Sequence, residues 1–398
     1  MSFDVDAIRS RYPALAEGYL HFDNAGGSQV AAPVADAVAA TMRAAVSNRS
    51  PAFEPGRRSG EIVAAARHAL ADLLGAAPQG VVLGPSATAL TYRVARALAD
   101  TWRPGDEIIV SRLDHDANVR PWVQLAARAG AVVRWAEFDR ATGDLPAGQF
   151  TELIGERTRL VALTAGSNAN GAVPDVDAIT AIARAAGALT YVDGVHSTPH
   201  VLTQTTADFY VTSAYKWSGP HLAAVAADPA LWERLRPMKL APSSEAVPDR
   251  FELGTPGFAQ LAGVTAAVEH LADLASSSGP DRRSRLRASF AEIQRYETGL
   301  LTRLLDGLAA LPGVTVLPAP RRRCPTVSFR LADQAPARTA ALLGDRNICV
   351  SAGDYYAYEF FEALGLRDGG GAVRASIYHY NTADEVDTLL NALSELQG

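Results

Sequence analysis

The sequence has few cysteines and no long apolar run. Its two cysteines, Cys324 and Cys349, are isolated and form no CxxC pair, so neither a disulfide framework nor a cysteine zinc site is indicated. No run of about eighteen apolar residues occurs, so no membrane span is predicted. The N-terminus carries acidic residues and lacks an apolar core region, which argues against a signal peptide. These absences favour a cytoplasmic enzyme.

Positive charge is also in deficit. The formal net charge is −6, and no basic run is long enough to resemble a nucleic-acid footprint. The densest basic cluster, residues 321–323, is predicted to be a solvated loop. With 398 residues, 48% of them hydrophobic, the chain can bury a sizeable core without metals or disulfides, and its length suits two domains. We therefore expect a soluble globular enzyme with no bound metal and no nucleic-acid partner.

Lysine is the scarcest charged residue. Only two of the 37 basic residues are lysines, Lys216 and Lys239, and the other 35 are arginines. A codon bias explains most of this. It remains informative that lysine can lose its proton and attack a carbonyl, whereas the guanidinium of arginine stays protonated. A lysine kept in such a chain is a candidate nucleophile.

Strand-like and helix-like segments alternate between residues 60 and 230. Helical spacing of apolar residues predicts helices over 62–74, 87–102, 118–129 and 176–186. Short apolar runs predict strands over 81–84, 107–111, 131–137, 159–164, 189–193, 207–212 and 222–226. This rhythm indicates an α/β fold with a mostly parallel sheet covered by helices on both faces.

The rest of the chain has the pattern of a smaller α+β domain. A long helix is predicted over 282–311 and a final helix over 383–396, with strands at 315–317 and 326–330 between them. The glycine-rich residues 369–371 are predicted to be a loop. We expect a large domain over residues 19–270 and a small C-terminal domain over 271–398, with residues 1–18 packing on the latter.

Polar groups follow successive predicted strands. Asp193 ends one strand, and Lys216, Asn168 and His115 each come shortly after another. Residues 86–88, Ser-Ala-Thr, follow a strand and open a helix, whose free N–H groups can hold a phosphate. Each group alone is more often a cap, a turn or a surface residue. Five groups at one sheet edge match what a pyridoxal 5′-phosphate (PLP) site requires, namely a lysine, a carboxylate, a stacking ring and a phosphate cradle.

The sequence resembles the class V aminotransferase family of fold-type I PLP enzymes, and within it the cysteine desulfurase-like subgroup. The resemblance covers nearly the whole chain. It rests on Tyr-Leu-His-Phe-Asp-Asn-Ala-Gly-Gly-Ser (19–28), Asp-His-Asp-Ala-Asn (114–118), Tyr-Val-Asp-Gly-Val-His (191–196), Ser-Ala-Tyr-Lys-Trp-Ser-Gly-Pro (213–220), Arg-Phe-Glu-Leu-Gly-Thr-Pro (250–256) and Arg-Ala-Ser-Ile-Tyr-His-Tyr-Asn-Thr (374–382).

The resemblance implies roles for the residues at the reacting end of the site. Lys216 matches the Schiff-base lysine, and Asp193 matches the partner of the pyridinium nitrogen. His115 matches the imidazole that stacks on the cofactor ring and moves protons at the substrate. Arg374 matches the arginine that clamps the substrate α-carboxylate, and Asn24 belongs to the same substrate-binding end.

Further residues match contacts to the cofactor, and one of them implies a homodimer with shared active sites. Two of these residues, His196 and Tyr215, depart from the family's pattern. Desulfurases often carry Gln at the first position and His at the second. The implied contacts are Asn168 and His196 near the 3-oxygen, Ala87, Thr88, Ser213 and Tyr215 at the phosphate, and Thr255, donated to the phosphate by the partner subunit.

A cysteine desulfurase also needs a mobile cysteine that accepts sulfur. The matching loop here is 351–358, and Tyr356 stands at the best-matching position. Cys349 lies nearby in a strand-like run and is predicted to be a core residue. The first hypothesis is therefore a desulfurase-like or C–S lyase-type enzyme acting on a small amino acid without that cysteine. An aminotransferase and a PLP-binding protein without catalysis are the alternatives, and the substrate side chain is not predictable.

Overall fold

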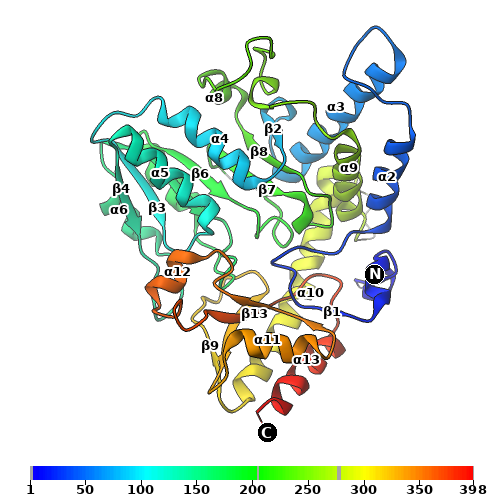
Figure 1. Ribbon diagram of the computed structural model, residues 1–398, viewed down its shortest axis with the longest axis vertical. Coiled ribbons are helices and arrows are strands. Elements are labelled where there is room, and N and C mark those ends of the chain that lie inside the picture. The colour runs from blue at the N-terminus through cyan, green and yellow to red at the C-terminus, as the bar shows by residue number, and fades with distance from the viewer. Residues whose placement is uncertain (1–2, 204–205, 276–278, 398) are drawn as a thin grey trace.

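The computed structural model describes residues 3–203, 206–275 and 279–397. A seven-stranded sheet occupies the upper half of the molecule in Figure 1, with strand order β2-β8-β7-β6-β5-β3-β4. Only β8 runs antiparallel to its neighbours, so the sheet is mostly parallel, as predicted. Its strands are β2 (Val81–Gly84), β3 (Glu107–Ser111), β4 (Val132–Ala136), β5 (Thr158–Thr164), β6 (Leu189–Asp193), β7 (Phe209–Ser213) and β8 (Ala223–Ala227).

Helices bury both faces of this sheet. Successive strand residues enter different cores: Val161 and Val192 face one, whereas Leu160 and Tyr191 face the other. The first core is closed by α3 (Glu54–Leu74), α7 (Val176–Ala185) and α9 (Phe258–Ala272). The second is closed by α4 (Ala87–Ala99) and α5 (Arg120–Ala129), with α8 (Pro229–Glu233) at the periphery, whereas α6 (Phe150–Leu153) packs in the first core.

A second, smaller sheet lies in the lower half of Figure 1. Its order is β12-β13-β10-β9, and all its pairings are antiparallel. Its elements are α10 (Arg282–Ala310), β9 (Val314–Val316), β10 (Thr326–Leu331), α11 (Pro336–Gly344), β11 (Ile348–Cys349), β12 (Ser351–Gly353), α12 (Tyr358–Ala363), β13 (Ala372–Ser376) and α13 (Ala383–Glu395). A separate core of leucine, valine and phenylalanine side chains holds this part together.

The N-terminal segment contacts both parts of the molecule. From α1 (Val5–Arg9), the Arg9 side chain pairs with Glu385 at 2.8 Å, in the C-terminal part. The Tyr12 hydroxyl lies 2.8 Å from His270 Nε2 on α9 and 2.9 Å from His379 Nε2. Strand β1 (Leu20–His21) then pairs in parallel with β11. The division at residue 270 and the assignment of residues 1–18 to the small domain remain predictions.

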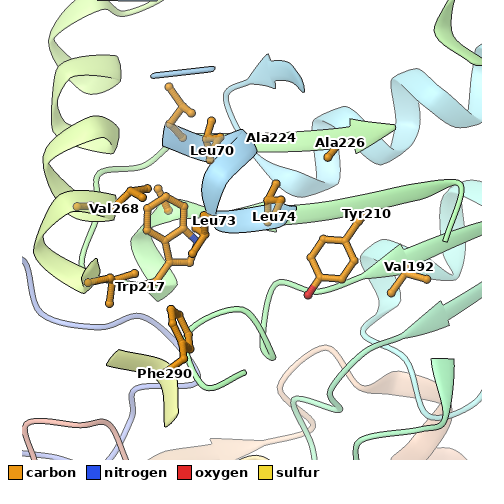
Figure 2. Packing of buried hydrophobic residues seen from close by; sticks show 14 of the residues in the cluster. Leu70, Leu73, Leu74, Val192, Tyr210, Trp217, Ala224, Ala226, Val268 and Phe290 are labelled. Carbon is orange, nitrogen blue, oxygen red and sulfur yellow. The ribbon is translucent and has the colours of Figure 1, made fainter. Parts of the chain in front are cut away.

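The turn that carries Lys216 is fixed by the side chain that follows it. Trp217 is completely buried, and its indole N–H donates to Thr212 Oγ1 at 3.1 Å. Figure 2 shows its ring among Leu73 of α3, Val268 of α9 and Phe290 of α10. The preceding 3₁₀ turn, Ala214–Lys216, is thereby tied to a rigid core, so the lysine side chain leaves the backbone from a fixed point.

The predicted elements agree with the structure in type, and several of them differ at their ends. The helix predicted over 87–102 ends at Ala99, because residues 100–102 form turns before Pro104. The helix predicted from residue 118 begins at Arg120, after a 3₁₀ turn over Asp116–Asn118. Helix α2 (Ala32–Arg43) was not predicted, and Val34 is its one residue classed as buried. No helix in the described residues is both long and apolar enough to cross a membrane.

Candidate active site

A cavity of ≈ 390 Å³ lies beyond the carboxyl ends of the large sheet's strands. Strands β2, β3, β5, β6 and β7 all point their carboxyl ends toward it, which is where open α/β sheets bind ligands. Strands β12 and β13 of the smaller sheet and the loop between β12 and α12 also line it. Nine residues predicted from the sequence line its wall: Ala87, Thr88, His115, Asn168, Asp193, His196, Tyr215, Lys216 and Arg374.

Lys216 is the nucleophile candidate on the cavity wall. Its ammonium donates to the backbone carbonyls of Ala25 and Gly26, the latter at 3.1 Å, and it lies 5.1 Å from the centre of the Tyr215 ring. Burial lowers the pKa of Lys216 to about 7, aided by the positive charge of Arg374 and opposed by Asp193. A substantial fraction of this amine is therefore neutral, and nucleophilic, at neutral pH.

Asp193 faces Lys216 from the end of β6. Its Oδ1 accepts a hydrogen bond from the Val195 backbone N–H at 2.9 Å. Burial raises the pKa of Asp193 to about 6, against the effect of the Val195 N–H and of Lys216. The following glycine is required by packing, because a Cβ on Gly194 would lie 1.9 Å from the Tyr210 ring. Asp193 is thus a buried carboxylate suited to a cationic partner in the cavity.

His115 is held in one orientation at the opening of the cavity. Its Nδ1 accepts a hydrogen bond from the Ala117 backbone N–H at 3.0 Å, which leaves the proton of the neutral ring on Nε2. Burial lowers the pKa of His115 to about 4, with a further contribution from Lys216. The imidazole is therefore neutral near pH 7. Tyr356 stacks on it, with ring centres 5.5 Å apart and planes at 23°.

The N-terminus of α4 forms an anion site at one end of the cavity. Ser86 caps the helix by accepting from the Ala89 N–H at 3.2 Å. The backbone N–H groups of Ala87 and Thr88 lie in the first turn, where no intrahelical acceptor exists, and both residues line the cavity. Free N–H groups and the helix dipole together favour a phosphate at this point.

Arg374 supplies positive charge on the cavity wall. Its guanidinium is buried at 3% exposure, donates to the Asn168 carbonyl at 2.9 Å and to Ser351 Oγ at 3.3 Å, and lies over the Tyr355 ring. Its Nε has no hydrogen-bond partner, and no carboxylate pairs with it among the described residues. A buried guanidinium without a counter-ion favours a carboxylate ligand.

Asn168 and His196 complete the wall near Asp193. The Asn168 amide nitrogen donates to the Tyr355 carbonyl at 2.8 Å, and its Oδ1 is buried without a partner. His196 is 4% exposed, and its Nε2 lies 3.0 Å from Thr326 Oγ1. Burial lowers the pKa of His196 well below its ordinary value. Both side chains therefore offer neutral hydrogen-bonding groups to a ligand.

Three predicted residues do not line the cavity. Ser213 is buried at the end of β7, and its Oγ has no partner. The Asn24 amide nitrogen donates to the carbonyls of His21 and Ser376 at 2.8 and 2.9 Å, and the Tyr380 hydroxyl donates to the Asn24 amide oxygen. The hydrogen-bonding groups of this side chain are therefore used within the protein. Thr255 is exposed, in the connection between β8 and α9.

Two further residues at or near the site, Tyr355 and Asp114, were not singled out from the sequence, and Tyr356 was noted only as the residue at the position of the sulfur-accepting cysteine. Tyr355 and Tyr356 line the cavity with backbone φ angles of 50° and 60°, and their carbonyls accept from Asn168 and from the Asp116 N–H. Asp114 accepts from Thr164 N at 3.1 Å and thereby joins the ends of β3 and β5. Burial raises the pKa of Asp114 to about 7. Two successive tyrosines in a loop near Arg374 were the only sequence sign of this wall.

The thiols lie away from the cavity. Cys349 is part of β11, is half-buried and pairs in register with His21 of β1. Burial raises the pKa of the Cys349 thiol. Cys324 is fully buried, and burial raises its pKa to about 12. Neither has the thiolate character that a nucleophile or sulfur carrier requires, and no group of three metal-ligating side chains occurs in the described part of the chain.

Comparison with known proteins identifies the same family that the sequence resembles. The family described as aminotransferase class-V matches residues 20–389. The uncharacterized protein MT3887 of Mycobacterium tuberculosis is 37% identical over the whole of both chains. A probable cysteine desulfurase of Pseudomonas aeruginosa is 33% identical, covering 97% of this chain and 96% of its own.

A solved structure shares the fold along the full chain. The crystal structure of a cysteine desulfurase of Escherichia coli superposes with a TM-score of 0.87 at 27% identity, covering 100% of this chain and 99% of its own. The predicted fold-type I architecture, a mostly parallel large-domain sheet with a smaller α+β part, is thereby confirmed.

Proposed function

Because this chain belongs to the class V aminotransferase family, in its cysteine desulfurase-like branch, we propose that it is a PLP-dependent enzyme acting on a small amino acid. The reaction that we propose is cleavage at the substrate's Cβ–S bond or a related lyase reaction, without a persulfide cysteine. The observation that carries this proposal is the cavity in which Lys216, Asp193, His115 and Arg374 meet. We also propose a cytoplasmic location.

The residues of the cavity fit pyridoxal phosphate. The N–H groups of Ala87 and Thr88 are free for its phosphate, and Asp193 offers a carboxylate for its ring nitrogen. Lys216, with a pKa of about 7, offers a neutral amine for its aldehyde. The bound cofactor would supply an electron sink that stabilises negative charge at the substrate Cα. The unpartnered Oδ1 of Asn168 and the cavity side of His196 remain for its other polar groups.

The chain's own residues orient the substrate and move its protons. Arg374 binds the α-carboxylate, since no carboxylate of the described residues forms an ion pair with its buried guanidinium. Lys216 would act as a base, because its lowered pKa allows its neutral amine to take the Cα proton near neutral pH. The Nε2–H of neutral His115 can donate a hydrogen bond to a departing group. Tyr356 stacks on His115 beside this position.

Tyr356 favours a lyase over a sulfur-transferring desulfurase. It lines the cavity at the position where the family's persulfide cysteine is expected, and no thiol is present on the wall. A phenol cannot accept sulfur as a persulfide, so sulfur would leave the site as sulfide. Transamination, the other reaction of this family, needs the same lysine and carboxylate. Product analysis distinguishes it from the lyase reaction.

A panel of L-amino acids, including L-cysteine, L-alanine and L-aspartate, tests the proposed function. We expect pyruvate and sulfide from L-cysteine in equal amounts. Stoichiometric conversion of the cofactor to pyridoxamine phosphate would indicate a transaminase instead. A protein that binds no PLP, or whose absorption spectrum no amino acid changes, would contradict the proposal.

We further propose that the active enzyme is a homodimer with shared sites. Thr255 is exposed, away from the cavity of its own chain, in the connection between β8 and α9. The same connection exposes Met238, Leu240 and Leu253 at 77%, 69% and 51%. Large apolar side chains gathered on one exposed segment support an interface with a second copy, which would carry Thr255 to the partner's phosphate site.

Subunit mixing tests whether Thr255 acts across the dimer. We expect Thr255→Ala to weaken PLP binding by about tenfold, through loss of one hydrogen bond to a charged group. Heterodimers of Thr255→Ala with Lys216→Ala subunits should regain one site with wild-type PLP affinity and turnover. If Thr255 acted within its own chain, every site of the heterodimer would be defective, and no such recovery would be measured.

Removal of the Cys349 thiol should leave turnover largely intact. Cys349 is outside the cavity, and burial raises its pKa, so the expected change of kcat/KM for Cys349→Ala is less than about threefold. Initial rates of sulfide release measure it, with circular dichroism as the control for folding. A folded but inactive Cys349→Ala enzyme would restore the persulfide mechanism.

A further inference from the structure

His196 has one ring nitrogen bound by the protein and one that is not. Nε2 lies 3.0 Å from the hydroxyl of Thr326, the first residue of β10. Nδ1 has no hydrogen-bond partner among the described residues, and the ring forms part of the cavity wall. Thr326, in the smaller sheet, therefore binds one ring nitrogen of His196, and the other ring nitrogen is free for a ligand in the cavity.

The hydrogen-bonding needs of Thr326 decide which of the two side chains donates. Thr326 is fully buried, and His196 is the only partner of its hydroxyl in the described part of the chain. If the imidazole donated to the hydroxyl, the hydroxyl hydrogen would be buried without an acceptor, which is costly. If the hydroxyl donates to Nε2, every hydrogen of the pair is satisfied except the one on Nδ1. The donor is therefore Thr326.

The surroundings keep His196 neutral. His200 lies edge-on to it, with ring centres 5.5 Å apart, and its Nδ1 is 2.9 Å from Glu297. Arg374 and Lys216 add positive charge from the cavity side, and burial itself disfavours the imidazolium. A neutral imidazole has a single N–H. Since Nε2 accepts from Thr326, that hydrogen is on Nδ1.

We propose that Thr326 is a positioning residue that fixes His196 as its Nδ1–H tautomer, so that His196 donates a hydrogen bond to the phenolic oxygen of the cofactor. The ligand class is an anionic or strongly accepting oxygen, because the exposed group is a donor only. This inference rests on the proposed function for the identity of the ligand, whereas the tautomer is a property of the protein alone. A glutamine at position 196 could donate without such a partner; a histidine depends on it.

Thr326→Val tests the proposal, because valine keeps the shape of threonine and removes its hydroxyl. In full-length protein labelled with ¹⁵N-histidine, long-range ¹H–¹⁵N correlation should show the His196 proton on Nδ1, and Thr326→Val should lower the population of this tautomer in the PLP-free protein, where no ligand oxygen accepts from Nδ1. His196→Gln assigns the resonance. The measurement is made with and without PLP. An Nε2–H tautomer in the unsubstituted protein would overturn the proposal.

The absorption spectrum of the PLP-bound protein gives a second readout. A donor to the phenolic oxygen stabilises its anionic form, so loss of the donor raises the pH at which the visible band changes; we expect a rise of about one unit in Thr326→Val. Thr326→Ser keeps the hydroxyl and should show the unsubstituted value. Equal midpoints in the Val and Ser variants would contradict the role. Absence of PLP binding in all variants would contradict the proposed function, and the tautomer measurement would still decide the Thr326 pair.

Discussion

Replacing Lys216 with alanine should abolish both the covalent attachment of PLP and turnover. Borohydride reduction of the PLP-loaded enzyme should fix the cofactor to a peptide containing Lys216, and Lys216→Ala should yield no such peptide. We expect kcat to fall by about 10³-fold or more, since general base catalysis alone contributes about 10²–10⁴. The variant should still bind PLP noncovalently, because the N–H groups of Ala87 and Thr88 and the Asp193 carboxylate are unchanged.

The chain provides a matched control for this experiment. Lys239 is the only other lysine, and its ammonium is bound by Glu245 at 2.6 Å and by the Ser243 carbonyl at 3.0 Å, away from the cavity. Lys239→Ala should therefore retain the reduced adduct and full turnover. An adduct that persists in Lys216→Ala and disappears in Lys239→Ala would move the nucleophile to Lys239 and refute the assignment.

Much of the site could be predicted because its residues follow strands that the sequence makes evident. Strands β3 and β6 have the predicted bounds, so Asp193 was placed correctly at a carboxyl end, and His115 four residues after another. Parallel neighbours bring such positions to one edge whatever the loops do. The nine predicted residues on the cavity wall come from this rule together with the family resemblance.

The remaining features depend on contacts between distant parts of the chain. The sequence around Trp217 does not predict that it is completely buried beneath the turn that carries Lys216. Its burial results from the packing of α3, α9 and α10 around it. The partner of His196 is Thr326, 130 positions along the sequence. The two-residue strands β1 and β11 have no periodicity to detect, and they tie the segment that contains Asn24 to the small domain. Local pattern carries no information on any of these pairings.

The thiols illustrate how sequence and structure limit the chemistry together. The sequence places no cysteine in the loop over 351–358, and the structure puts Tyr356 of that loop on the cavity wall, stacked on His115. Cys349 is in strand β11 and Cys324 is in a buried connection, and burial raises the pKa of both thiols. The site therefore keeps the groups that act at Cα and lacks a group that could carry sulfur away.

Asp193→Asn should have the second largest effect. Asparagine keeps the size of the side chain, and its oxygen can still accept from the Val195 N–H, but the negative charge is lost. At an effective dielectric of about 20, a charge pair about 4 Å apart contributes about 4 kcal/mol. Each 1.36 kcal/mol is tenfold in rate. We expect kcat to fall by about 10²–10³-fold, with PLP still covalently attached to Lys216.

The comparison that isolates this charge is Asp208→Asn. Asp208 accepts from the Thr190 N–H and hydroxyl at 2.8 and 2.9 Å, between the starts of β6 and β7 and outside the cavity. Its substitution should lower the denaturation midpoint without changing kcat by more than about twofold. Rapid-mixing absorption of the PLP-bound Asp193→Asn enzyme with substrate should locate its loss at removal of the Cα proton, since substrate binding depends on Arg374, which is unchanged. If kcat survived in Asp193→Asn, the buried carboxylate would serve the fold alone, and the electron sink that the proposed function requires would have to depend on another group.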